Sequence, residues 1–413
     1  MFAFSACSSK NAVYIVSIEK TDSNGLKDTY TITYSDGSTS EIVITNGKDG
    51  EDGNDAENVG TYEMWKTAVE KEEFTGSYID FLKEVFSVSA DISKDVADNC
   101  LESVVSIATY NYSQYPLTTG SGLIYELDEN GNALILTNFH VACSGQFPIA
   151  TYNLYLNSST FSMFEATYVG GSSKYDIAVL KVTESEVLKN SNAKPIKIRK
   201  TPVSAGETVV AIGNTKNYGI SVTKGIISVE SEFVSMNVGG YVANRRLLRH
   251  DAYISNGSSG GGLFDSNGNL VGITNGGVDG TLINYAIPTD ILTAVVDNIL
   301  ENCLDTSNTS VLACKTGLSI STMENHPIIK GFAQGELLSN GILQLDDKLT
   351  SVTIIPQEGN SKTYTITNFH NFDECLLQSR IGDTIVISAK RGETTVTDSI
   401  VVTEENYKAI SVM

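Results

Sequence analysis

A glycine-rich stretch between two apolar strands is the feature that most restricts how this chain can fold. Ser255–Phe264 reads SNGSSGGGLF, which is too rich in glycine for a core element. Apolar alternation leads into it from Leu247 and out of it from Leu270, so the stretch is predicted to be a rigid turn between two strands of one sheet. Glycine permits positive φ and close backbone approach, and successive N–H groups can therefore point into one small cavity.

This turn has the composition of an acyl-transfer site. Ser259 stands at its tip, between Gly257 and the glycines that begin at Gly260. A nucleophilic serine must be clear of other side chains, and the backbone N–H groups of Gly257 and Ser259 can converge on a developing oxyanion. A Gly/Ser surface loop is the alternative, and this stretch alone does not separate the two.

A weakly nucleophilic hydroxyl needs a general base, and the base needs a carboxylate that orients it. The chain has four histidines, and His140 directly follows the apolar strand ALILTNF. Downstream, Asp176 opens the apolar strand IAVLKV, where a half-buried carboxylate needs a partner such as an imidazole N–H. Taken singly, a structural histidine and a strand or turn cap are the alternatives for these two residues.

Motifs spread over the middle of the chain resemble the HtrA (Deg) branch of the trypsin-like serine proteases. The resemblance covers about Leu101 to Leu300 and depends on motifs that occur in the family's order. These motifs are GSGLIY, LILTNFHV, YDIAVLKV, AIGN, SVTKGIISV, DAYISNGSSGGGLFDSNGNLVGITN and NYAIP. The resemblance implies that His140 is the general base, Asp176 its orienting carboxylate and Ser259 the nucleophile, with the N–H groups of the preceding turn as oxyanion hole.

The chain departs from the family pattern at two positions of this turn. Ser258 stands where the family usually has Asn, and Gly262 where it often has Pro or Ala. The first position contributes chiefly a backbone turn, so the oxyanion hole is expected to survive. The resemblance also implies that the strand after the turn flanks a shallow apolar pocket for small aliphatic side chains. The candidate substrate-binding residues on this strand are Thr274, Asn275 and Gly276.

Composition excludes several other classes of function. The 413 residues suffice for about two to four domains, and 49 acidic against 28 basic residues give a net charge of -21. This charge disfavours nucleic acids and anionic membrane surfaces as partners. No apolar run reaches the length of a transmembrane helix. The six cysteines lack the spacing of a zinc site, and Cys303 with Cys314 is the only plausible local disulfide. No metal or other cofactor is expected.

The residues before the protease motifs are predicted to form a tether and small modules. Phe4–Cys7 reads FSAC and resembles a bacterial lipobox, with Cys7 as the lipidated residue and 1–10 as a truncated signal and tether whose true start lies upstream. An accidental match is the alternative. Residues 11–47 alternate as a small β module with a hairpin turn at Asp36-Gly37, and 48–60 form an acidic, glycine-rich linker. Residues 61–97 show helical spacing and are a candidate element for assembly into trimers.

The remainder of the chain is predicted to be mainly β. Residues 98–303 are expected to form two six-stranded antiparallel barrels, closed by a helix after Pro288, and 311–410 to form a PDZ-like α/β domain. Thr316–Ile320 fits the carboxylate-binding loop of such a domain only loosely. His370 is predicted to be an ordinary surface residue.

A basic run before the nucleophile is interpreted as a solvated loop, with a regulatory loop as the alternative. This run comprises Arg245, Arg246, Arg249 and His250.

These observations favour a serine endopeptidase that hydrolyses unfolded or exported polypeptides through an acyl-enzyme. Its expected place is outside the cytoplasm, attached to a bacterial membrane only by a lipid, and its expected assembly is a homotrimer. Two alternatives stay open. One is an inactive barrel with a peptide-binding domain that acts as a surface chaperone or scaffold. The other is a processing protease with few natural substrates.

Overall fold

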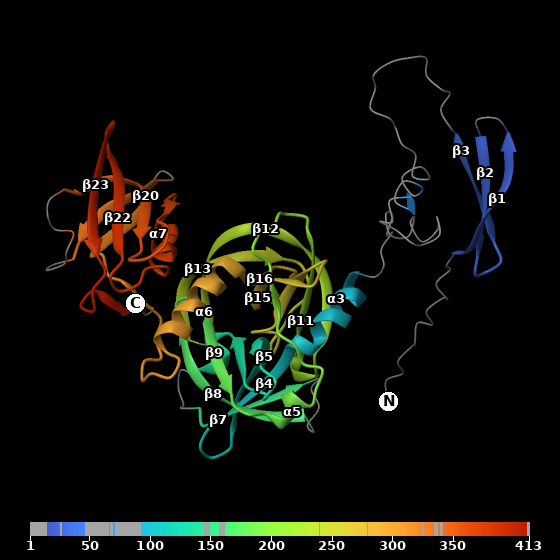
Figure 1. Cartoon of the computed structure of the whole chain (residues 1–413), viewed down its shortest axis with the longest axis horizontal. Helices are drawn as coiled ribbons and strands as arrows, with labels where there is room; N and C mark the ends of the chain where they lie inside the picture. The colour runs from blue at the N-terminus through green and yellow to red at the C-terminus, as the bar shows by residue number, and fades with distance from the viewer. Residues whose placement is uncertain are drawn as a thin grey trace. The chain divides into compact units, whose positions relative to one another are not determined.

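The structure is a computed structural model that describes residues 15–24, 27–45, 66, 69–70, 92–143, 149–156, 162–238, 240–278, 280–323, 326–333, 338 and 342–410. The chain divides into two compact units, Met1–Val88 and Ser89–Met413 (Figure 1). The lipobox with Cys7, the acidic linker and, apart from residues 66 and 69–70, the part 61–91 of the predicted helical segment 61–97 lie outside the described residues. Residues 92–97 of that segment belong to a helix. None of the helices in the described ranges has the length and apolar character needed to cross a bilayer.

The first unit contains the predicted β module as a three-stranded antiparallel sheet in the order β1-β2-β3. Its strands are β1 (Ile15–Asn24), β2 (Lys27–Tyr34) and β3 (Thr39–Thr45). The hairpin between β2 and β3 turns at Asp36 and Gly37, as predicted. Gly37 has φ 81°, and the carboxylate of Asp36 accepts a hydrogen bond from the backbone N–H of Ser38 at 2.9 Å. An Asp-Gly pair forms this turn because glycine adopts positive φ without strain.

Six strands of the second unit close into the first barrel in the order β4-β5-β6-β9-β8-β7. They are β4 (Val104–Tyr110), β5 (Pro116–Leu127), β6 (Ala133–Thr137), β7 (Thr151–Leu156), β8 (Met163–Ser172) and β9 (Ile177–Val182). The helix α3 (Ile92–Cys100) and a 3-10 turn at Leu101–Ser103 precede the barrel. The short helix α5 (Glu186–Lys189) follows it. The strands β6 and β9 are almost wholly buried, which explains their unbroken apolar sequences.

The second barrel follows the order β15-β14-β11-β12-β13-β16 and closes through pairing of β15 with β16. A further strand, β10 (Lys197–Ile198), pairs in parallel with β15. The barrel strands are β11 (Thr208–Gly213), β12 (Ser221–Val238), β13 (Tyr241–His250), β14 (Gly262–Asp265), β15 (Asn269–Gly277) and β16 (Asn284–Pro288). The predicted closing helix is α6 (Thr289–Asn302), whose apolar face packs into the common core. The predicted double-barrel fold is therefore confirmed.

The C-terminal domain is an antiparallel sheet with one helix, arranged as β18-β19-β20-β22-β23 with β21 paired to β20. Its strands are β18 (Leu318–Met323), β19 (His326–Phe332), β20 (Lys348–Ile355), β21 (Lys362–Thr365), β22 (Thr384–Arg391) and β23 (Thr394–Val401). A separate pair joins β17 (Leu312–Cys314) to β24 (Tyr407–Ala409). The helix α7 (Phe369–Leu376) is capped by the Asn368 side chain and buries Phe372 and Cys375 in the domain core.

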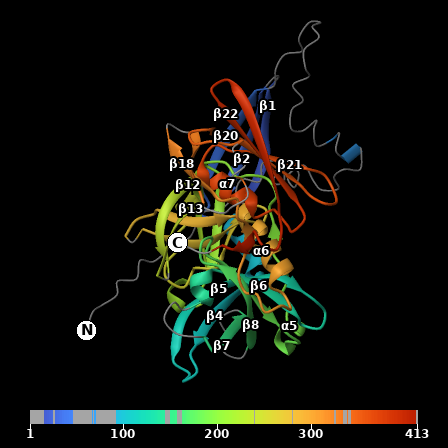
Figure 2. The same cartoon turned by 90° about the vertical axis from the view of Figure 1, so that its left-hand side faces the viewer.

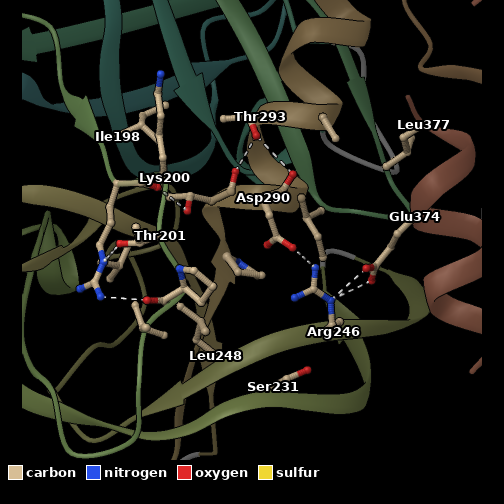
Figure 3. Close-up of a pocket in the computed structure, with 18 of the residues that line it drawn as sticks. Ile198, Lys200, Thr201, Ser231, Arg246, Leu248, Asp290, Thr293, Glu374 and Leu377 are labelled. Carbon is tan, nitrogen blue, oxygen red and sulfur yellow. Dashed lines mark hydrogen bonds and ion pairs between the residues drawn. The ribbon is translucent and has the colours of Figure 1, made fainter. Parts of the chain in front are cut away.

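The helix α7 also faces the protease, beside the ribbon of β12 and β13 (Figures 1 and 2). The Arg246 guanidinium lies between the carboxylates of Asp290 and Glu374, with 2.9 Å from its Nε to Glu374 Oε2 (Figure 3). Burial raises the pKa of Glu374 to about 7, although Arg246 lowers it. A cleft of about 970 Å³ beside this contact lies between the two domains, lined by Arg246 and Glu374 but not by Ser259.

Three predictions about this half of the chain are wrong. The basic run is not a solvated loop, because it lies in β13, where Arg245 and His250 are buried at 4% and 0% exposure. His370 is not a surface residue, because it is 9% exposed and stacks on Phe233 with 4.3 Å between ring centroids.

Cys303 and Cys314 are not joined by a disulfide. They belong to different cores: Cys303 packs in the protease core, whereas Cys314 lies in the core of the C-terminal domain.

Candidate active site

The predicted base and its carboxylate come together at the edge of the first barrel. The strand β6 ends at Thr137, and a single helical turn, α4 (Phe139–Ala142), presents His140. The Nδ1 atom of His140 lies 2.8 Å from Oδ2 of Asp176, and the backbone N–H of His140 donates to Oδ1 at 2.9 Å. The Asp176 carboxylate thus fixes both the ring and the main chain of the histidine, which leaves Nε2 as the nitrogen for proton transfer.

Asp176 is held by the surrounding protein rather than by solvent. Its side chain is 2% exposed, and its φ of 56° lies in the left-handed region, which Asp tolerates better than most residues. The Asn138 side chain donates to its backbone carbonyl at 2.9 Å. Just upstream, the Arg245 guanidinium donates to the carbonyls of Ser173 and Lys174, at 2.8 and 3.0 Å. The buried arginine therefore braces the turn that carries the carboxylate.

Asn275 joins this pair to the predicted nucleophile. Its side-chain N–H donates to Oδ2 of Asp176 at 2.6 Å, and its backbone carbonyl accepts a hydrogen bond from the Ser259 hydroxyl at 3.0 Å. His140, Asp176, Asn275 and Ser259 consequently form one hydrogen-bonded chain across the two barrels. Because the Ser259 hydroxyl donates to the Asn275 carbonyl, it must reorient before it can donate to the imidazole.

The turn around Ser259 leaves two backbone donors open. Neither the N–H of Gly257 nor that of Ser259 donates to an acceptor among the described residues. Gly257 has φ 94°, and a Cβ added there would lie 2.2 Å from the backbone oxygen of Asn214. Gly260 has φ 86°, and a Cβ added there would lie 2.1 Å from the carbonyl oxygen of Ser121. Only glycine fits these positions, which explains the composition of the turn.

The two departures from the family pattern leave the turn intact. The Ser258 hydroxyl is buried and lies 3.1 Å from the Thr215 hydroxyl. At Gly262, a Cβ would approach the ring of Phe264 to 2.3 Å, so the large aromatic side chain occupies the space that Ala or Pro would need.

The strand predicted to bind substrate is β15, and its residues face different ways. Thr274 turns inward, where its hydroxyl donates to the carbonyl of Ser258 at 2.6 Å. The side chain of Asn275 is directed at Asp176, whereas Gly276 is half-buried. Sequence reasoning missed the contacts of Thr274 and Asn275 with the catalytic elements, because only the register of β15 against β14 and β16 decides which way each side chain points. No cluster of metal-ligating side chains occurs in the described ranges.

Comparison with known proteins agrees with this geometry. Residues 120–273 match the family model described as a trypsin-like peptidase domain. The chain is 34% identical over 202 residues to the serine endoprotease DegS of Escherichia coli (strain K12), an alignment that covers 47% of this chain and 52% of DegS. It is 32% identical over 190 residues to the serine protease Do-like HtrA of Bacillus subtilis, covering 44% of this chain and 39% of that protein. The chain thus spans about half the length, or less, of these curated relatives.

Among solved structures, the serine endoprotease from Yersinia pestis aligns with a TM-score of 0.52 at 25% identity, covering 75% of this chain and 97% of that one. The fold, the site and the matching family model together identify a trypsin-like peptidase domain at residues 120–273. Within that class, the protease domain of this chain is similar to those of the HtrA/Deg-type serine proteases.

Proposed function

We propose that the protein is a serine endopeptidase that hydrolyses unfolded or exported polypeptides through an acyl-enzyme. The observation that carries the proposal is the hydrogen-bonded chain His140–Asp176–Asn275–Ser259 beside the open N–H groups of Gly257 and Ser259. A base, its orienting carboxylate, a hydroxyl and two backbone donors are the complete set of groups that acyl transfer requires.

In this mechanism His140 Nε2 takes the hydroxyl proton as Ser259 Oγ attacks the scissile carbonyl carbon. The new oxyanion accepts hydrogen bonds from the N–H groups of Gly257 and Ser259. The protonated imidazole, stabilised by Asp176, then gives its proton to the leaving amine as the C–N bond breaks. Water then enters, and His140 takes its proton as the water oxygen attacks the ester carbon. The imidazolium gives this proton to Ser259 Oγ as the ester C–O bond breaks, which releases the carboxylic acid and the free hydroxyl.

Several finer assignments belong to the same proposal. The main chain of β15 from Thr274 to Gly276 flanks the bound polypeptide, with Gly276 the most accessible of the three. The C-terminal domain is PDZ-like and captures extended peptides. The working place is extracytoplasmic, with Cys7 as a lipid anchor, and the assembly is a homotrimer; the FSAC sequence and the helical spacing of 61–97 support these assignments.

Replacement of the nucleophile tests the proposal. In Ser259→Ala, kcat on an unfolded protein substrate should fall by about 10⁶, with an unchanged circular dichroism spectrum. A variant that retained wild-type activity would refute the proposal.

One observation favours a second candidate, an inactive peptide-binding scaffold: the Ser259 hydroxyl donates to the Asn275 carbonyl and not to the imidazole. If wild-type protein and Ser259→Ala bind peptides equally and neither cleaves them, the scaffold is the correct function.

A further inference from the structure

We propose that the hydroxyls of Ser121 and Thr274 are positioning groups that hold the oxyanion hole in shape, one from each barrel. Both hydroxyls belong to buried residues, Ser121 at 0% and Thr274 at 1% exposure. Both act on the backbone that carries the two oxyanion donors, Gly257 and Ser259. This inference rests on the proposed peptidase function and concerns how its reaction is accelerated.

The two oxyanion donors are oriented through the carbonyls of the residues that precede them. In a trans peptide the C=O of one residue and the N–H of the next point in opposite directions, so fixing the carbonyl fixes the donor. The Asn256 carbonyl accepts the backbone N–H of Lys216 at 2.6 Å, which aims the N–H of Gly257 the other way. The Ser258 carbonyl accepts the Thr274 hydroxyl at 2.6 Å, which aims the N–H of Ser259.

The peptide group between these two is held by Ser121. The carbonyl of Gly257 accepts the Ser121 hydroxyl at 2.8 Å, and the same hydroxyl accepts the backbone N–H of Asn214 at 2.8 Å. On the other side of this peptide, the N–H of Ser258 donates to the carbonyl of Ser255 at 2.9 Å. Ser121 lies in β5 of the first barrel and is fully buried, so the first barrel contributes a clamp to an oxyanion hole built by the second.

The turn has its own bonds, from the Gly261 N–H to the Ser258 carbonyl and from the Ser258 N–H to the Ser255 carbonyl, both at 2.9 Å. The two hydroxyls reinforce these bonds because the glycines make the turn soft. Gly257 has no Cβ and adopts φ 94°, a region in which glycine moves between several backbone states at little cost. The oxyanion requires donors within about 2.7–3.1 Å of its position, and loss of one donor typically lowers kcat by about 10²–10³. If a donor stays in place but loses the bond that orients it, kcat should fall by less, on the order of 10-fold to 100-fold.

The test compares Ser121→Ala and Thr274→Val with the wild-type full chain on a fluorogenic peptide. Both variants should lower kcat by roughly 10-fold to 100-fold with little change in KM, because the clamps act on the transition state. Affinity for a peptidyl boronate, whose tetrahedral adduct places an oxygen in the oxyanion hole, should fall by a similar factor. Thr274→Ser keeps the hydroxyl and should restore both quantities.

Thr109→Val is the matched control. Thr109 is a fully buried threonine of the first barrel whose hydroxyl bonds to the carbonyl of Thr118, away from the turn, so its loss should leave kcat unchanged. Ser121→Ala and Thr274→Val variants that fold and keep the kcat and boronate affinity of this control would overturn the inference while leaving the peptidase function standing. If Ser121→Ala does not fold, the kcat and boronate affinity of Thr274→Val and Thr274→Ser decide whether the inference holds. A wild-type protein that neither cleaves peptides nor binds the boronate would overturn the proposed function and this inference with it.

Discussion

Removal of the Asn275 side chain should lower kcat/KM strongly, although Asn275 is not a member of the triad. Its amide donates to the buried carboxylate of Asp176 at 2.6 Å and is itself 1% exposed. A hydrogen bond to a charged group contributes about 1.5–3 kcal/mol. Since each 1.36 kcal/mol is a factor of ten in rate, Asn275→Ala should lower kcat/KM by about 10-fold to 150-fold if the whole contribution acts through the orientation of Asp176 and His140.

The pH profile separates this role from a merely structural one. In Asn275→Asp a second carboxylate lies against Asp176, and two close carboxylates do not both ionise readily. The acid limb of kcat/KM should therefore move to higher pH in Asn275→Asp, whereas Asn275→Ser, which keeps a short donor, should retain the wild-type limb. These variants are measured on a fluorogenic peptide from pH 5 to 9, beside their circular dichroism spectra. A folded Asn275→Ala with wild-type kcat/KM and pH profile would refute the assigned role.

Two further predictions concern the turn and the core. Gly257→Ala should lose labelling by an active-site-directed phosphonate, because its Cβ would lie 2.2 Å from the Asn214 backbone oxygen at φ 94°; undiminished labelling would contradict the geometry of the turn. His250 is fully buried, and burial lowers its pKa to about 4 from an ordinary value of 6.5. Its neutral form stabilises the native state above pH 6.5, and this contribution is lost as the pH falls toward 4. Wild-type protein should thus lose about 3 kcal/mol more unfolding free energy than His250→Gln between pH 7 and pH 4. Equal losses in urea unfolding would show that His250 does not titrate in this way.

Local pattern predicted much of the fold, because both barrels follow from strands that alternate between turns. Local pattern singled out His140, Asp176 and Ser259 by their places at strand ends and at the tip of a glycine turn, but their roles as a triad came from the resemblance to the HtrA family. The contacts of Ser121, Arg245 and Asn275 were not predictable in this way. Ser121 bonds to a carbonyl 136 positions away, and Arg245 to one 72 positions away. Such partners depend on strand register and barrel docking, which residue types alone do not specify.

The error over the basic run has the same cause. A run of charged residues in a sequence usually indicates a solvent-exposed segment. Here Arg245 is satisfied by backbone carbonyls of the turn before Asp176, and Arg246 by carboxylates from α6 and α7. Burial of these cations is possible only because groups distant in sequence supply acceptors for them.

The most direct test of the central claim is reaction of the purified protein with a fluorophosphonate probe, read by intact mass and peptide mapping. An activated nucleophile at Ser259 should give one adduct on that residue, absent from both Ser259→Ala and His140→Ala. Absence of the adduct in wild-type protein, even with unfolded polypeptide present, would contradict the assignment of Ser259 as a nucleophile activated by His140 and would favour the peptide-binding scaffold.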